Sequence, residues 1–125
     1  CRAVADGRFA TLFGVDEMLL SAWAAGCDGA VGSTYNFMAP LYRRMLAAFE
    51  AGRVEEARSL QAQATAITRR IVADSGVSGL KATMELVGPS CGPTRRPLPR
   101  MTAAAIADLH RDLTAAGLSE LVTGG

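Results

Sequence analysis

The chain has 125 residues, of which 50% are hydrophobic and 20% are charged, a balance typical of one globular domain and not of a disordered segment. Its 13 Lys and Arg nearly cancel its 12 Asp and Glu, so there is no net field to hold a nucleic-acid backbone or an anionic membrane. Charges or glycines also break every apolar stretch before the roughly 20 residues that a membrane span needs. Neither nucleic acid nor membrane is therefore an expected partner.

The cysteines bear on the compartment and on one alternative chemistry. Cys1, Cys27 and Cys91 are odd in number, scattered, and without metal-ligand spacing, so we expect no disulfide framework, no metal site and a cytoplasmic location. Cys1 could be an N-terminal nucleophile with its own amine as general base. Such enzymes need many strands, and only two or three are predicted here. A chain that begins inside an element of a longer protein fits the first residues better.

The first fifty residues predict a strand–helix–strand–helix order. Short apolar runs at 8–13 and 28–32 are each bounded by glycine or aspartate and are typical of buried parallel strands. Between them, residues 16–25 carry apolar side chains at helical spacing, with acids in the first turn and Gly26 after the last. A second helix, capped by Thr34 or Asn36 and tolerating Pro40 in its first turn, is predicted to run to Glu50.

Beyond Gly52 only helices are predicted. An apolar stripe from Val54 to Ile71 with steps of three and four residues indicates a long amphipathic helix. A shorter helix is expected over 79–87, followed by a Pro-rich loop over 88–99. Thr102 is the predicted cap of a last helix, with Leu109 and Leu113 inside and His110 on its solvated side.

These elements predict an α/β protein with an incomplete sheet. Right-handed crossovers make the two strands parallel neighbours. Two parallel strands cannot form a whole sheet, because parallel sheets are buried on both faces. We therefore expect residues 1–50 to be the last two βα units of a larger α/β protein and residues 51–125 to be an α-helical extension.

The candidate site follows the two strands. In α/β folds, ligands bind beyond the carboxyl ends of the strands, where this sequence has Gly14, Asp16 and Glu17 after the first strand and Gly32 and Ser33 after the second. Carboxylates and a hydroxyl on one rim would suit a ligand rich in hydroxyl groups. The alternative is structural, because the same residue types cap helices. Spacing alone leaves these two interpretations equally supported.

Several strings add a resemblance to this pattern. GVDEMLLSAWAAGCDGAVGSTYNFMAPLY, EAGRVEEARSLQ, SGLKATMELVG and TRRPL resemble the C-terminal portion of the dihydrodipicolinate synthase/N-acetylneuraminate lyase family of pyruvate-dependent class I aldolases. GxDE and GSTYN at this separation favour the sialic acid branch over the dihydrodipicolinate synthase branch.

The resemblance implies units seven and eight of a (β/α)8 barrel with a helical extension. It implies cleavage of N-acetylneuraminate to N-acetylmannosamine and pyruvate through a lysine Schiff base, without metal or organic cofactor, in a homo-oligomer that is a tetramer in the family. Gly14, Asp16, Glu17, Gly32 and Ser33 match the family's contacts to the sugar acid. No residue here matches the family's nucleophile, which would precede Cys1, so no catalytic residue is predicted in this chain.

Three alternatives stay open. The single lysine, Lys81, could form the imine, but it falls in a helix of the extension and is predicted to be an ion-pair partner. Val15 stands where the lyases often carry an aromatic, which leaves a related aldolase for another keto-deoxy sugar acid. The amphipathic helices would also allow a non-catalytic assembly module.

Overall fold

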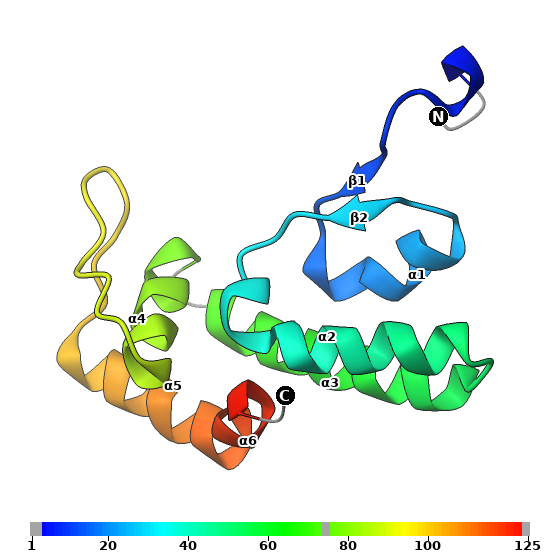
Figure 1. Ribbon diagram of the computed structural model, residues 1–125. Coiled ribbons are helices and arrows are strands. Elements are labelled where there is room, and N and C mark those ends of the chain that lie inside the picture. The colour runs from blue at the N-terminus through cyan, green and yellow to red at the C-terminus, as the bar shows by residue number, and fades with distance from the viewer. Residues whose placement is uncertain (1–3, 74–75, 124–125) are drawn as a thin grey trace.

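The computed structural model describes residues 4–73 and 76–123. In chain order its elements are η1 (Val4–Gly7), β1 (Leu12–Phe13), η2 (Asp16–Met18), α1 (Leu19–Ala24), β2 (Gly29–Ala30), α2 (Tyr35–Glu50), α3 (Val54–Val72), α4 (Val77–Val87), α5 (Ala103–Ala115) and α6 (Leu118–Thr123). Figure 1 shows the strand pair above α1, the antiparallel pair α2 and α3 below it, and α4 to α6 grouped at one end. Cys1 lies outside the described residues, so the structure does not bear on the N-terminal nucleophile.

The predicted pairing of the two strands is confirmed, but their predicted length is wrong. β1 and β2 are parallel, with Leu12 opposite Gly29 and Phe13 opposite Ala30. Each has two residues in place of the six and five predicted. Among the described residues each strand has only the other as a hydrogen-bonded neighbour.

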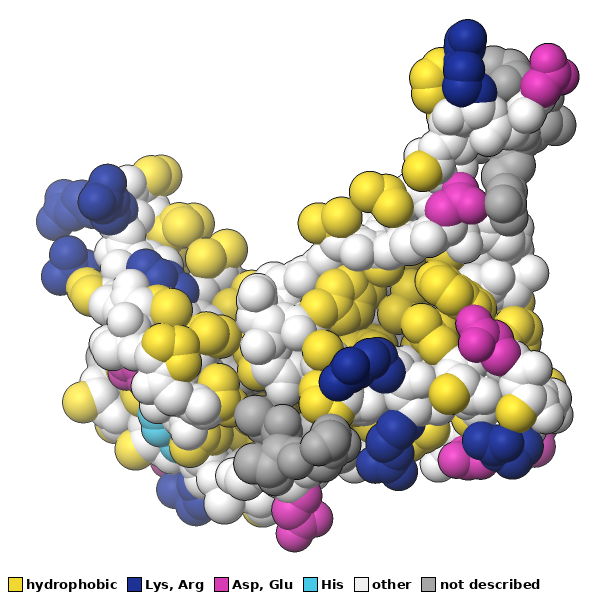
Figure 2. Space-filling view, in the orientation of Figure 1, with side chains coloured by type: hydrophobic (Ala, Val, Ile, Leu, Met, Phe, Trp, Pro, Cys, Tyr) yellow, Lys and Arg dark blue, Asp and Glu magenta, His cyan; other side chains and the backbone are white. Residues whose placement is uncertain are grey.

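The strands are also less buried than predicted. The side chains of Leu12 and Val31 are 60% and 65% exposed. In Figure 1 both α1 and α2 lie on one side of the strand pair, and no described helix covers the other side. Figure 2 shows a wide hollow between this pair and the loop that precedes α5, with hydrophobic side chains along its rim.

The first helix forms in two parts and ends as predicted. Residues 16–18 make a 3-10 turn before α1, where the sequence predicted one helix from Asp16 to Ala25. Gly26 has a φ of 87°, and its amide donates to the carbonyl of Trp23 while Cys27 donates to Ala22. This is the left-handed glycine stop that returns the chain towards β2.

α2 and α3 form the centre of the hydrophobic core. α2 is kinked at Met38, two residues before Pro40, whose ring and missing N–H interrupt regular helix. The predicted stripe of α3 is confirmed, since its buried members include Leu60, Ile67 and Ile71. The same core cluster continues into α1, α4, α5 and α6, so both halves of the chain share one core.

The helices after α3 pack against this core and complete it. Thr102 caps α5 as predicted, its hydroxyl accepting from the Ala105 amide at 3.2 Å. Leu109 and Leu113 are buried as predicted. His110 was predicted to be solvated, but it is half-buried and its Nε2 lies 2.8 Å from the carbonyl oxygen of Ala82, which joins α5 to α4.

Two features of the C-terminal half of the chain were not predicted. α6 was missed because six residues are too few to show a helical period, although Leu118 at its start is fully buried. α4 begins at Val77, two residues earlier than expected. Gly79 lies where α4 crosses α3, and a Cβ there would come within 2.0 Å of the carbonyl oxygen of Ile71, so this crossing needs glycine.

Candidate functional site

The loops that follow β1 and β2 meet at one edge of the strand pair. Because the strands are parallel, residues 14–17 and 31–34 leave them on the same side. The ladder extends one step into this region, since the Val31 amide donates to the Phe13 carbonyl at 2.9 Å. The structure thus brings the five sequence-predicted residues into two adjacent segments that follow the strand ends.

Asp16 joins the two loops. Its Oδ2 accepts a hydrogen bond from the Thr34 amide at 2.9 Å and another from the Thr34 hydroxyl at 2.5 Å. Both residues are buried, Asp16 at 6% exposure and Thr34 at 0%. The capping interpretation therefore holds for Asp16, but across the chain: it receives the amide at the start of α2 and not one in its own helix.

Gly32 makes room for that carboxylate. A Cβ on Gly32 would lie 1.7 Å from Oδ1 of Asp16. A Cβ on Gly14 would meet nothing closer than the Val31 carbonyl oxygen at 4.0 Å. Of the two loop glycines predicted to let a ligand approach, only Gly32 is thus required by the packing of the chain itself.

Two tyrosines of α2 extend the Asp16–Thr34 pair inward. The Tyr42 hydroxyl lies 3.1 Å from Oγ1 of Thr34, and since Thr34 donates its own proton to Asp16, Tyr42 is the donor in this contact. The ring of Tyr35 packs edge-on against that of Tyr42, with centroids 4.7 Å apart. Sequence analysis missed both tyrosines, because each also fits an ordinary position on a core helix.

Burial governs the ionisation of these tyrosines. The pKa of Tyr35 is raised far above its usual value, mainly by burial and then by the negative charge of Asp16. Its hydroxyl is buried and has no hydrogen-bond partner within residues 4–73 and 76–123. Burial also raises the pKa of Tyr42, against the opposing effect of its hydrogen bond with Thr34. Both tyrosines are therefore neutral over the physiological range.

Glu17 and Ser33 differ from Asp16 in being accessible. Glu17 is half-buried and Ser33 is exposed. The Ser33 carbonyl accepts from the Asn36 side chain at 2.9 Å, which fixes its backbone. In the described part of the chain neither the Glu17 carboxylate nor the Ser33 hydroxyl has a hydrogen-bonding partner. They are therefore the polar groups of these loops that remain available to a ligand's hydroxyl groups.

In the part of the chain that the structure describes, no three His, Cys, Asp or Glu side chains are placed to hold a metal ion. No helix in residues 4–73 or 76–123 has the length and apolarity to cross a membrane.

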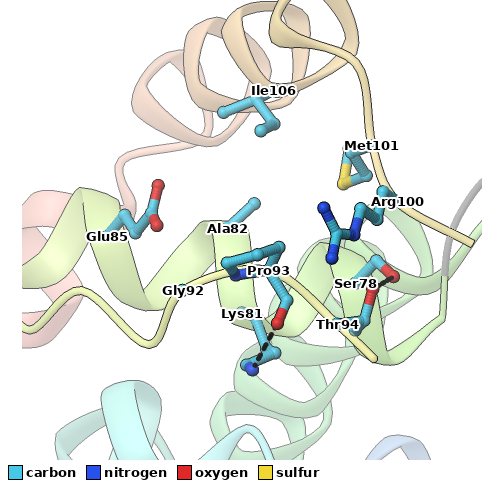
Figure 3. A pocket seen from close by; sticks show the side chains of 10 residues that line it. All are labelled: Ser78, Lys81, Ala82, Glu85, Gly92, Pro93, Thr94, Arg100, Met101 and Ile106. Carbon is cyan, nitrogen blue, oxygen red and sulfur yellow. Dashed lines mark hydrogen bonds between the residues drawn. The ribbon is translucent and has the colours of Figure 1, made fainter. Parts of the chain in front are cut away.

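A pocket lies in the extension, around Lys81. It has a volume of about 250 Å³ and lies between α4, residues 92–94 and residues 100–106, with Glu85 and Arg100 at opposite ends (Figure 3). The predicted ion pair of Lys81 is wrong: its Nζ donates to the Pro93 carbonyl at 3.1 Å. Lys81 thus ties the Pro-rich loop to α4 and lies in a different element from the strand-end loops.

Comparisons of sequence link the chain to known proteins. The profile of the "Dihydrodipicolinate synthetase family" matches residues 1–116. The chain is 41% identical over 97 residues to the N-acetylneuraminate lyase of Rhizobium meliloti (strain 1021), which covers 78% of this chain and 32% of that protein. It is 43% identical over 108 residues to the N-acetylneuraminate lyase of Rattus norvegicus, which covers 85% of this chain and 34% of that protein.

A comparison of structures agrees. Proteus mirabilis N-acetylneuraminate lyase matches 94% of this chain with a TM-score of 0.89 and 37% sequence identity, and the match covers 40% of that chain. The present chain spans about a third of the length of the curated relatives that it matches.

Proposed function

Because the chain belongs to the Dihydrodipicolinate synthetase family, we propose that it supplies part of the sugar-binding site of an N-acetylneuraminate lyase. The reaction is cleavage of N-acetylneuraminate to N-acetylmannosamine and pyruvate. The observation that carries this proposal is the pair of adjacent loops after β1 and β2, in which Glu17 and Ser33 keep accessible polar groups while Asp16 and Gly32 lock the loops together.

In this proposal some of the predicted site residues bind the sugar acid and the others hold the site in shape. Glu17 accepts hydrogen bonds from the hydroxylated tail of the sugar acid, and Ser33 contributes a hydroxyl from the neighbouring loop. Gly14, where a Cβ would meet only the Val31 carbonyl oxygen at 4.0 Å, lets the ligand approach the backbone. Asp16 and Gly32 act mainly by fixing the distance between the loops, since Asp16 is only 6% exposed.

The strand pair is proposed to be units seven and eight of a barrel, with residues 1–50 as barrel and 51–125 as helical extension. Exposure of Leu12 and Val31 supports further strands, because strands of a parallel sheet are normally covered on both faces. The hollow in Figure 2 gives room for them beside β1 and β2. Assembly into a homo-oligomer stays a prediction.

The imine-forming lysine is proposed to lie outside residues 1–125. An aldolase lysine must be free to attack the pyruvate carbonyl, and desolvation or a neighbouring cation normally prepares it. Lys81 is held by the Pro93 carbonyl in the extension instead. This chain thus contributes binding groups, and the remainder of the barrel contributes the nucleophile and the pyruvate pocket.

The test is the activity of the complete reading frame that contains this chain. We expect pyruvate release from N-acetylneuraminate, followed by a lactate dehydrogenase assay. Condensation of pyruvate with aspartate semialdehyde and no cleavage of N-acetylneuraminate would contradict the proposal and support a dihydrodipicolinate synthase. A reading frame that encodes no strand-borne lysine before Cys1 would support the non-catalytic assembly module.

A further inference from the structure

Two polar side chains of α3 reach across to the segment that carries Glu17. The Gln61 side-chain amide donates to the Asp16 carbonyl at 3.3 Å and accepts from the Leu20 amide at 2.9 Å. The Thr65 hydroxyl donates to the Glu17 carbonyl at 3.1 Å. Gln61 and Thr65 are also joined to each other, with Nε2 and Oγ1 3.3 Å apart.

These contacts supply hydrogen bonds that residues 15–20 do not make among themselves. The residues at the starts of η2 and α1, Val15 and Met18, supply no side-chain cap. The first amides of a helix have no partner within it, and helices as short as α1 are not stable alone. Gln61 satisfies one of these amides, that of Leu20, from a helix more than forty residues away in sequence.

Gln61 and Thr65 do not belong to the residues of α3 that pack in the hydrophobic core. The buried stripe of α3 is formed by Ala57, Leu60, Ala64, Ile67, Thr68 and Ile71. Gln61 and Thr65 lie beside that stripe, are half-buried, and direct their polar atoms to the backbone of residues 16, 17 and 20. Directional bonds of this kind fix an orientation that apolar contact leaves loose.

We infer that Gln61 and Thr65 are positioning residues, which hold the backbone of residues 16–20 so that the Glu17 carboxylate meets the hydroxylated tail of the sugar acid. This inference rests on the proposed function. It gives the helical extension a part in substrate selection: α3 sets the geometry of the sugar-tail site, whereas the pyruvate end of the substrate is bound elsewhere.

The experiment uses the complete aldolase that contains this chain and compares Thr65→Val with Thr65→Ser. Valine keeps the shape of threonine and removes the hydroxyl, whereas serine keeps the hydroxyl. We expect Thr65→Val to raise KM for N-acetylneuraminate about fivefold to tenfold, the factor for one lost hydrogen bond, with little change in kcat. Thr65→Ser should stay near wild type, and Gln61→Leu should resemble Thr65→Val.

Two controls separate positioning from stability. Thr83→Val removes another helix hydroxyl, one that bonds the Gly79 carbonyl within α4, and should leave KM unchanged. Borohydride trapping of the pyruvate imine should proceed equally in all variants, because pyruvate lacks the sugar tail. An increase in KM with Thr83→Val, or loss of imine trapping with Thr65→Val, would assign the effect to general destabilisation and overturn the inference.

A double-mutant cycle tests whether the effect passes through Glu17. If it does, Thr65→Val should have little further effect on KM once Glu17→Gln is present. Full additivity of the two changes would overturn the inference. So would a wild-type KM for Thr65→Val and Gln61→Leu in an enzyme that cleaves N-acetylneuraminate. Absence of any cleavage by the wild-type enzyme would instead contradict the proposed function.

Discussion

The carboxylate of Asp16 lies directly over the α-carbon of Gly32, so close that a methyl group on Gly32 would come within 1.7 Å of Oδ1. They lie sixteen positions apart in sequence, and together they fix the distance between the ends of β1 and β2. The hydrogen bonds from Thr34 to the same carboxylate keep it there.

Gly32→Ala should therefore destabilise the protein. We expect a loss of about 1–3 kcal/mol, the usual cost of overpacking, because the added methyl group must displace Asp16. Gly14→Ala is the matched control and should cost less than about 1 kcal/mol, since its Cβ meets only an atom at 4.0 Å. Urea denaturation measures both. In an Asp16→Ala background the cost of Gly32→Ala should shrink, and equal costs in both backgrounds would contradict the steric explanation.

Asp16 and Glu17 are adjacent carboxylates with different expected roles. Asp16→Asn should lower the free energy of unfolding by about 1–3 kcal/mol, because a buried charge that accepts two hydrogen bonds is replaced by a neutral amide. Glu17→Gln should change it by less than about 0.5 kcal/mol. In the complete aldolase, Glu17→Gln should instead weaken N-acetylneuraminate binding more than pyruvate binding. Equal losses for both ligands would count against a sugar-tail role.

Because Tyr35 and Tyr42 are buried, we expect the protein to lose stability at alkaline pH. Their folded-state pKa values lie above the usual value. Ionisation of the two tyrosines therefore has no effect on the free energy of unfolding below about pH 10, and that free energy falls as the pH rises from there towards the folded-state pKa. The unfolded chain releases these protons first, and stability falls. Tyr35→Phe should make that fall shallower when urea denaturation is compared at pH 8 and pH 11.

The same substitutions should differ at neutral pH. Tyr42→Phe removes the donor to Thr34 and should cost about 1 kcal/mol. Tyr35→Phe removes a buried hydroxyl that forms no hydrogen bond with any described residue, so it should be neutral or stabilising. Destabilisation by Tyr35→Phe comparable to that of Tyr42→Phe would show that the Tyr35 hydroxyl is satisfied.

The sequence predicted the elements better than it predicted their contacts. Alternating strand and helix signals in residues 8–50, and the apolar stripe of α3, follow from local periodicity and were confirmed. The length of the strands depends on partners that local pattern does not reveal, and it was overestimated. The sequence also predicted which residues follow the two strand ends. Whether a carboxylate there caps a helix or binds a ligand depends on long-range geometry, and the ligand-binding role stays a prediction.

Gln61 and Thr65 illustrate the part that local pattern cannot give. On a helical wheel they lie beside the apolar stripe and fit an ordinary boundary between buried and solvated faces. Only the fold brings them to the carbonyls of Asp16 and Glu17. The prediction that His110 is solvated was wrong for the same reason, since its partner, the Ala82 carbonyl, belongs to another helix.

The last prediction concerns Lys81, the single lysine of the chain. If residues 1–125 contribute binding groups without the nucleophile, borohydride reduction in the presence of pyruvate should leave Lys81 unmodified. The reason is geometric: its Nζ is engaged by the Pro93 carbonyl in the extension, away from the loops after β1 and β2. Peptide mapping by mass spectrometry distinguishes Lys81 from the N-terminal amine, which can also form an imine with pyruvate. The complete aldolase, treated in parallel, should gain one pyruvyl group on a lysine outside this chain. A stoichiometric adduct on Lys81 in both proteins would make Lys81 the nucleophile and would move the reaction centre to the pocket of Figure 3.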